Sequence, residues 1–210
     1  MKALTPEQWS IVLRRMGVAP YEASLWDDHF AAVIVPGVFS LGDQEVDDFL
    51  ANVLHESNRL TRMAEVLNYR TPERLMQVWP SRFKTREAAL PYVGNPQKLA
   101  EKVYGGRLGN TTIGDAYAYR GSGPIMVTGK ANFAALEKAT GIPLVKNPDL
   151  LRRPGPEPLR VCVAWWEGNV PDSVVGNIKR TRRAVNGGDI GLQDVVKLSA
   201  VAGQALGAFA

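Results

Sequence analysis

Apolar side chains recur at helical spacing along most of this chain of 210 residues. The strongest pattern follows Asp43, where apolar residues recur at positions i, i+3, i+4, i+7 and i+8, as they do in a helix with one buried face. Asp43 fits the N-cap of this helix, which we expect to continue to Glu56. The apolar positions are Val46, Phe49, Leu50, Val53 and Leu54.

Other segments carry helix-start signals or shorter periodic runs. Thr5 and Pro6 fit the N-cap and first position of a helix that we expect to reach Met16, with Gly17 and Pro20 ending it. Shorter helices are expected near Pro72–Val78, Arg86–Tyr92, Pro96–Tyr104, Asn132–Thr140, Glu157–Glu167 and Leu192–Leu206.

Glycine and proline mark the breaks between these helices. Two glycine-rich loops are expected, at 105–123 and 186–191, and a small β-element is expected at Ile125–Thr128. The proline-rich stretch 153–158 is too short to separate two domains. The pattern therefore predicts a mainly α fold with little or no β-structure.

Length and composition are those of an ordinary globular protein with one core. We expect a single catalytic domain over residues 1–210. Within it, residues 1–42 form a helical segment packed on a core of residues 43–210. We expect the protein to be a monomer.

The charge balance is mildly basic, with 25 Lys and Arg against 21 Asp and Glu and a net charge of +4. It favours loose attraction to a polyanion such as nucleic acid, anionic lipid or a cell wall. The single cysteine, Cys162, excludes an intrachain disulfide and fits a small buried hydrophobe. The N-terminus lacks the apolar core of a signal peptide, and no apolar stretch is long enough to span a bilayer. We expect synthesis in a cytoplasm and no stable membrane insertion.

Several kinds of chemistry lack their residues. With two histidines and one cysteine in the chain, a structural zinc site is not expected. The sequence has no Walker A loop, no Gly-x-Gly-x-x-Gly motif and no Gly-x-Ser-x-Gly elbow. We therefore predict that the protein needs no metal or cofactor.

Two glutamates nine residues apart, Glu56 and Glu65, are the candidate catalytic pair. Phe49 and Glu56 are seven residues apart, so they lie within about 20° on the helical wheel. Glu56 is therefore at the rim of the apolar stripe, where partial removal from water favours a protonated carboxyl. His55 falls on the polar side, as a solvated residue or a support for its neighbours.

Glu65 cannot cooperate with Glu56 from the same helix. A continuous helix would place it about 13.5 Å further along and on the opposite face. The helix must therefore stop near Ser57 and Asn58, with the chain folding back before Glu65. Two carboxyls of which one is protonated are the minimal equipment for cleaving a glycosidic bond.

Further short motifs follow these glutamates in a fixed order. No single one is decisive, but together they span about residues 45–195. They are Phe49-Leu50-Ala51, His55-Glu56-Ser57, Glu65-x-Leu67-Asn68-Tyr69, Asn95-Pro96, Val103-Tyr104, Gly109-Asn110, Gly114-Asp115, Tyr119-Arg120-Gly121-Ser122-Gly123-Pro124-Ile125, Thr128-Gly129-Lys130-Ala131-Asn132-Phe133, Pro148-Asp149-Leu150-Leu151, Ala164-Trp165-Trp166 and the segment from Thr181 to Leu192.

In this order and spacing the motifs resemble glycoside hydrolase family 19, the chitinase-type family, and within it most nearly the phage endolysins. The resemblance implies a lysozyme-like helical fold with two lobes and a cleft, and a reaction that inverts the anomeric centre. It implies Glu56 as general acid, Glu65 as general base and Thr128 as the residue that holds the catalytic water. It also implies that Asn132 and Asn186 line sugar sites.

The loops beside these motifs supply further candidates for contact with a glycan. Tyr69, Tyr119 and Arg120 are predicted substrate-binding residues, whereas Trp165 and Trp166 fit the core better. Two departures from the family pattern stand out. Met126 occupies a position where the family usually has Gln.

The second departure is Val195, where the family usually has an Arg that would pair with the base carboxylate. In its absence, the residues considered as cationic partners of Glu65 are Arg120, Arg182 and Arg183.

The function predicted from the sequence is an endolysin-type peptidoglycan hydrolase that cleaves β-1,4 glycosidic bonds by inversion. Such a protein is made in a host cytoplasm and acts on the wall in the periplasm after another protein permeabilises the membrane. The alternative is a chitinase acting on β-1,4-linked N-acetylglucosamine polymers.

A different class is a cell-wall or nucleic-acid binding protein without catalysis. The basic run 179–183 could contact phosphates, but no recognised nucleic-acid motif accompanies it. We therefore expect no nucleic-acid partner.

Overall fold

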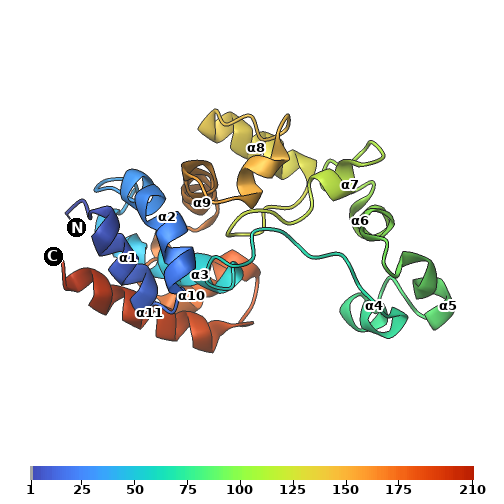
Figure 1. Ribbon diagram of the computed structural model, residues 1–210, viewed down its shortest axis with the longest axis horizontal. Helices are drawn as coiled ribbons and strands as arrows, with labels where there is room; N and C mark the ends of the chain where they lie inside the picture. The colour runs from blue at the N-terminus through green and yellow to red at the C-terminus, as the bar shows by residue number, and fades with distance from the viewer. Residues whose placement is uncertain (1) are drawn as a thin grey trace. The chain divides into compact units, whose positions relative to one another are not determined.

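The computed structural model describes residues 2–210, and its regular secondary structure is helical, with loops between the helices (Figure 1). Its β-structure consists of isolated bridges, Ala64 with Ser122 and Ser122 with Val127, so the expected β-element at 125–128 is a bridge rather than a strand. The α-helices are α1 (Pro6–Arg15), α2 (Pro20–Val33), α3 (Val46–Glu56), α4 (Pro72–Val78), α5 (Arg86–Ala89), α6 (Pro96–Tyr104), α7 (Asp115–Ala118), α8 (Lys130–Thr140), α9 (Pro156–Asn169), α10 (Ile178–Asn186) and α11 (Leu192–Gly207); the 3-10 helices are η1 (Gly42–Glu45), η2 (Leu90–Tyr92), η3 (Pro148–Arg152) and η4 (Asp172–Val174).

The expectation of a mainly α fold is thereby confirmed for the described residues. The chain forms two compact units, each made from separate stretches of sequence. Unit 1 comprises residues 1–63, 123–125 and 149–210, and unit 2 comprises residues 64–122 and 126–148. The role of the whole chain as one catalytic domain stays a prediction.

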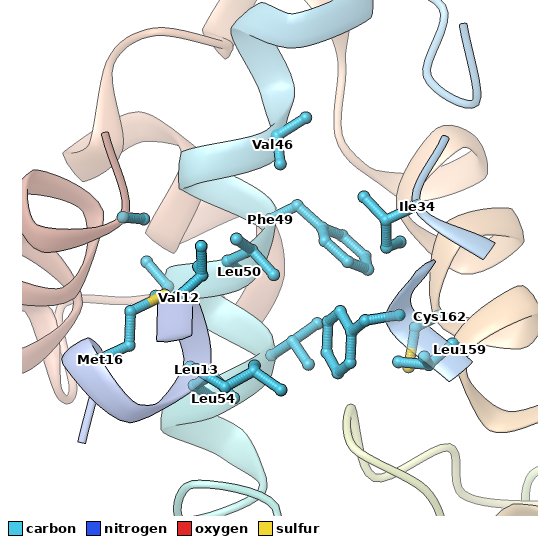
Figure 2. Close-up of a cluster of buried hydrophobic side chains, with 14 of the residues drawn as sticks. Val12, Leu13, Met16, Ile34, Val46, Phe49, Leu50, Leu54, Leu159 and Cys162 are labelled. Carbon is cyan, nitrogen blue, oxygen red and sulfur yellow. The ribbon is translucent and has the colours of Figure 1, made fainter. Parts of the chain in front are cut away.

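Unit 1 is built around α3. Figure 2 shows Phe49, Leu50 and Leu54 of this helix among side chains of the surrounding segments, including Val12 and Leu159. All five side chains are fully buried. The apolar residues that predict this helix therefore form part of the core of unit 1. The buried part of α3 ends at Leu54, two residues before the helix ends at Glu56.

The beginning of unit 1 differs in one respect from the sequence prediction. Thr5 caps α1 as expected, and its hydroxyl accepts a hydrogen bond from the Gln8 amide. Pro20, however, does not only end the preceding segment: it is the first residue of α2. Proline suits that position because its missing N–H is unpaired there in any helix. The two helices pack on each other, α1 also contacts α11, and α2 contacts α9.

Helix α3 starts later than predicted. Residues Gly42–Glu45 form the 3-10 turn η1, and α3 begins at Val46 rather than near Asp43. Glu45 is buried, and its carboxylate accepts hydrogen bonds from the indole of Trp166 at 2.6 Å and from the Leu41 amide at 2.8 Å. Trp166 is therefore a core residue, as predicted.

Unit 2 has a smaller core of its own. Leu75 of α4, Leu99 and Ala100 of α6 and Phe83 are buried together in it. Helices α4 and α6 have the predicted bounds because Thr71 and Asn95 cap their first turns through side-chain oxygens. The predicted helix at 86–92 is split into α5 and η2, and α8 begins at Lys130, two residues earlier than predicted.

No helix within residues 2–210 has both the length and the apolar character needed to cross a membrane.

Candidate active site

Glu56 is the last residue of α3, and its carboxylate meets a buried cation. Its Oε1 accepts a hydrogen bond from Nη1 of Arg182 at 2.6 Å. Arg182 belongs to α10 and is only 1% exposed. The Glu56 side chain is 24% accessible at the end of the buried face of α3, as its position on the helical wheel predicts, whereas the guanidinium group against its carboxylate was not predicted.

Helix α3 ends where the sequence predicts, at a turn with unusual backbone geometry. Asn58, Arg59 and Leu60 have φ angles of 49°, 59° and 67°, in the left-handed region that L-residues rarely occupy. The turn is fixed by the hydroxyl of Ser57, which accepts from the Leu60 amide and donates to the Val53 carbonyl. The last turn of α3 is thus tied to the segment that follows it.

His55 lies in a cluster of charged groups behind Glu56. Its Nδ1 is 2.7 Å from Oδ2 of Asp194, and both terminal nitrogens of Arg59 bond the same carboxylate. The hydrogen bond from Arg59 lowers the pKa of Asp194 to about 2, with a further contribution from His55. A Cβ placed on Gly191 would lie 2.1 Å from Nε2 of His55, so only glycine fits at this point.

The loop that follows α10 is held by two side chains of α10 itself. Nε of Arg182 donates to the Ile190 carbonyl at 2.8 Å, and Nδ2 of Asn186 donates to the same carbonyl at 3.2 Å. Oδ1 of Asn186 accepts from the Gly188 amide, so the Asn186 side chain shapes the loop from an exposed position. Asn186 is thereby placed in unit 1 together with Glu56.

The basic run 179–183 does not form one contiguous cationic surface. Thr181 and Arg182 are buried, and Thr181 donates to Oδ2 of Asp48 at 3.0 Å. Arg183 is exposed and forms a two-pronged pair with Asp189 in the following loop. The geometry gives no support to a phosphate-gripping role for the run as a whole.

Glu65 lies in unit 2, where neutral donors surround its carboxylate. Oε1 accepts from the Tyr104 hydroxyl at 2.8 Å, and Oε2 accepts from the Gly121 amide at 3.3 Å. The Glu65 amide also donates to the Gly121 carbonyl at 2.7 Å, which fixes the backbone. Burial raises the pKa of Tyr104 and the nearby Glu65 charge raises it further, so the phenol stays a donor at neutral pH.

None of the three arginines considered from sequence is recorded as the partner of Glu65. Arg120 lies 4.2 Å from the centre of the Tyr117 ring and donates to the Tyr117 carbonyl at 2.9 Å. Arg182 pairs with Glu56, and Arg183 pairs with Asp189. A phenol and a backbone amide bond the Glu65 carboxylate in their place.

Thr128 and Glu65 both lie next to Gly121, which has no side chain to separate them. A Cβ placed on Gly121 would be 3.1 Å from Cβ of Glu65 and 3.4 Å from Oγ1 of Thr128. The Thr128 hydroxyl donates to the Met126 carbonyl at 2.9 Å, which leaves its oxygen lone pairs as acceptors. Asn132 of α8 is exposed, and its amide donates to the Thr128 carbonyl at 2.7 Å. Unit 2 therefore brings Glu65, Thr128 and Asn132 together.

The two predicted tyrosines have different places in unit 2. Tyr69 is half-buried, with its ring 5.1 Å from that of Trp79, and burial and then the Glu65 charge raise its pKa. Tyr119 is only 6% exposed, packs on Phe133, and donates its hydroxyl to the Val145 carbonyl. Tyr119 is thus used in packing, whereas Tyr69 keeps an accessible part.

Sequence reasoning did not identify which residues hold the two glutamates, since it considered Arg182 only as a partner of Glu65. Tyr104 stands in the Val103-Tyr104 motif but had no role in the prediction. Arg182 lies four residues after Ile178 and three before Val185, which is the spacing of one helix face and could have revealed an inward-facing arginine. Within residues 2–210, no group of three or more His, Cys, Asp or Glu side chains could hold a metal ion.

Comparison with known proteins places this helical fold and its two glutamates in context. The chain is 33% identical over 153 residues to a glycosyl hydrolase family 19 domain-containing protein of Haemophilus influenzae, covering 71% of this chain and 74% of that protein. Two endochitinases of Arabidopsis thaliana are 38% and 36% identical over 72 residues, which are 34% of this chain and 25% of each plant protein. No protein-family model matches the chain.

Solved structures show the same fold. Chitinase C from Streptomyces griseus superposes with a TM-score of 0.57 at 19% identity, covering 98% of this chain and 93% of that one. A mutant of chitinase C gives a TM-score of 0.58 at 20% identity, with the same coverage. The fold and the sequence match define a glycosidase. The chain belongs to glycoside hydrolase family 19, as its motifs predict.

Proposed function

We propose that this glycosidase hydrolyses β-1,4 glycosidic bonds with inversion, using Glu56 as general acid and Glu65 as general base. The observation that carries the proposal is that each of the two glutamates of the family motifs is held by hydrogen bonds in a defined orientation. One is paired with a buried guanidinium group, and the other with a phenol and a backbone amide. Acid–base cleavage of a glycoside requires one carboxyl that donates a proton and one that accepts a proton.

In the proposed reaction, these two glutamates account for both proton transfers. Glu56 gives its proton to the glycosidic oxygen as the bond from that oxygen to the anomeric carbon breaks. Glu65 takes a proton from the attacking water. Thr128 supports this step because its hydroxyl hydrogen is engaged by Met126, so its oxygen can accept a hydrogen bond from the same water.

Contacts with the glycan are proposed at residues that keep an accessible surface. Tyr69 is half-buried, and Asn132 is exposed next to Thr128. Asn186 acts through the loop that it shapes, and Arg120 acts beside the Tyr117 ring. Tyr119 supports this region from the core through Phe133.

Peptidoglycan is the proposed substrate, in the role of an endolysin. The net charge of +4 supports this choice, since bacterial walls are anionic and chitin is not. In this role the enzyme acts on the wall in the periplasm after another protein has opened the membrane. Chitin is the second candidate, because the plant relatives are endochitinases and the solved structures are of a chitinase.

The test compares purified cell walls with chitin oligomers as substrates for the wild-type protein and for Glu56→Gln. Wild type should clear the wall suspension, and the variant should fold normally but lose about 10³-fold or more in rate, which is the scale of general acid catalysis. Glu7→Gln changes an exposed glutamate of unit 1 and is the matched control.

Three readings of this experiment decide between the candidates. Hydrolysis of chitin oligomers without clearance of walls would replace peptidoglycan by chitin. Substantial activity in Glu56→Gln would remove the acid role from this residue. Proton NMR of the first product should show the α-anomer, and a β-anomer would contradict inversion.

A further inference from the structure

Arg182 is a cation in the interior of unit 1 with three recorded bonds. Nη1 donates to Oε1 of Glu56 at 2.6 Å and to Oδ1 of Asn52 at 3.3 Å, both on α3. Nε donates to the Ile190 carbonyl at 2.8 Å, in the loop after α10. One side chain thus connects the helix that carries the proposed acid to the loop that follows Asn186.

Stability alone does not account for this arrangement. Removing a guanidinium group from water is costly, and a buried ion pair is often no more stabilising than apolar side chains of similar volume. Arg182 is 1% exposed and Glu56 keeps 24% of its side chain accessible, so the buried partner is the arginine. A chemical use for the pair is a better explanation than packing.

We infer that Arg182 is a positioning residue that sets both the orientation of the Glu56 carboxyl and the position of the loop at residues 187–191. The inference rests on the proposed role of Glu56 as the acid. It goes beyond that role by joining acid and loop in one side chain, which the sequence motifs do not predict.

The bond to Oε1 has a direct chemical consequence. With Oε1 held by an N–H donor, Oε2 is the oxygen that is free to carry the acidic proton. When this proton passes to the glycosidic oxygen and the bond to the anomeric carbon breaks, Glu56 becomes an anion beside a fixed cation. The guanidinium group therefore stabilises the charge that the reaction creates, and it is already in place.

Other charged groups of unit 1 lie near the end of α3. Nη2 of Arg62 donates to the backbone carbonyl of Glu56, and Asp194 of α11 binds both His55 and Arg59. Unlike the bond from Arg62, the hydrogen bond from Arg182 reaches a side-chain oxygen of Glu56. Removing its charge should therefore change the proton equilibrium that governs the alkaline side of the rate profile.

The experiment uses Arg182→Met, Arg182→Lys and the control Arg180→Met. Arg180 lies on the same helix as Arg182, but it is exposed. For each variant, kcat and KM are measured from pH 4 to about 9 on N-acetylglucosamine hexamer and on purified cell walls, and Tm is recorded.

Arg182→Met should lower kcat about 100-fold and move the alkaline limb of the profile about one pH unit higher, because losing the cation favours the protonated carboxyl. Arg182→Lys keeps the charge but lacks the Nε donor to Ile190. It should leave the alkaline limb in place and raise KM several-fold. Arg180→Met should stay within about twofold of wild type, as expected for a substitution at an exposed position.

Two results overturn the inference. One is a loss of activity in Arg182→Met that follows its Tm while the alkaline limb stays where it is. The other is an Arg182→Lys variant in which the alkaline limb of the pH–rate profile moves and KM is unchanged. This second result decides the question if Arg182→Met does not fold. If Glu56→Gln retains activity, the proposed function fails instead, and the two failures are distinguishable.

Discussion

The two glutamates of this glycosidase have opposite kinds of surroundings. Glu56 in unit 1 faces a buried guanidinium group, backed by a cluster of charged side chains that includes Asp194. Glu65 in unit 2 is bonded by a neutral phenol and a backbone amide. A fixed cation suits a group that becomes negative during reaction, whereas neutral donors orient an anion and leave it able to take a proton.

The strongest test of this contrast is Glu65→Gln. We expect a loss of about 10²- to 10³-fold in kcat with unchanged Tm, since the amide keeps the shape of the side chain but cannot accept a proton. Glu87→Gln, at an exposed position in α5 of the same unit, is the control. Initial rates on cell walls and chitin oligomers give the answer. Near wild-type rates in Glu65→Gln would leave unit 2 without a base.

A second test compares one glycine from each unit. Gly191→Ala should destabilise unit 1 by about 2–3 kcal/mol, because its Cβ would lie 2.1 Å from His55 and its φ is +76°. Gly121→Ala should destabilise by only about 1 kcal/mol, since its nearest contacts are 3.1 Å and 3.4 Å. Urea unfolding measures both. Equal effects would show that His55 moves aside easily and that the surroundings of Glu56 in unit 1 are not rigid.

A third test removes the phenol beside the base. Tyr104→Phe should lower kcat about tenfold, the scale of one hydrogen bond to a charged group. It should also move the acid limb of the profile to higher pH. The phenol donor stabilises the ionised carboxylate, so its removal favours the protonated form. Tyr92→Phe, within the small core of unit 2, is the control. An acid limb that stays in place would mean that Tyr104 serves packing only.

The smallest effect is expected from Asp194→Asn. The pKa of Asp194 is about 2 because Arg59 and then His55 bond it, below the ordinary value of about 3.9. Its stabilising effect is therefore complete above about pH 4 and disappears as pH falls towards 2. We expect a difference of about 1 kcal/mol or less at pH 7, since the side chain is 38% exposed and water screens the pair.

Urea titrations at pH 7, 4 and 2.5 check this trend. The gap between wild type and Asp194→Asn should close as the pH falls. A gap that stays constant would mean that shape, and not charge, sets the contribution of this side chain.

Much of the helical fold could be predicted from local signals. Helices α4 and α6 match their predicted bounds because Thr71 and Asn95 are strong caps in front of prolines. Helix α2 was missed because Pro20 was interpreted as the end of a helix, whereas proline also begins helices. Helix α10 was missed because its basic residues suggested a charged surface, although Thr181 and Arg182 point inward.

The chemistry of the site was only partly predictable. The motifs identify Glu56 and Glu65, but the partner of Glu56 lies 126 residues further along the chain. No local pattern connects residues at that distance, so the ion pair between Glu56 and Arg182 was not predicted. Tyr119 shows the same limit, since its position between motifs suggested glycan contact and its hydroxyl instead bonds Val145 in the interior.

The left-handed turn at residues 58–60 has a consequence for any attempt to transplant the acid onto another scaffold. Each of its three residues adopts the left-handed conformation, which costs an L-amino acid about 1–2 kcal/mol. A peptide copied from α3 alone would relax into an ordinary frayed end and lose the direction of Glu56. A working graft must also carry Asp194, which anchors Arg59 from far along the chain.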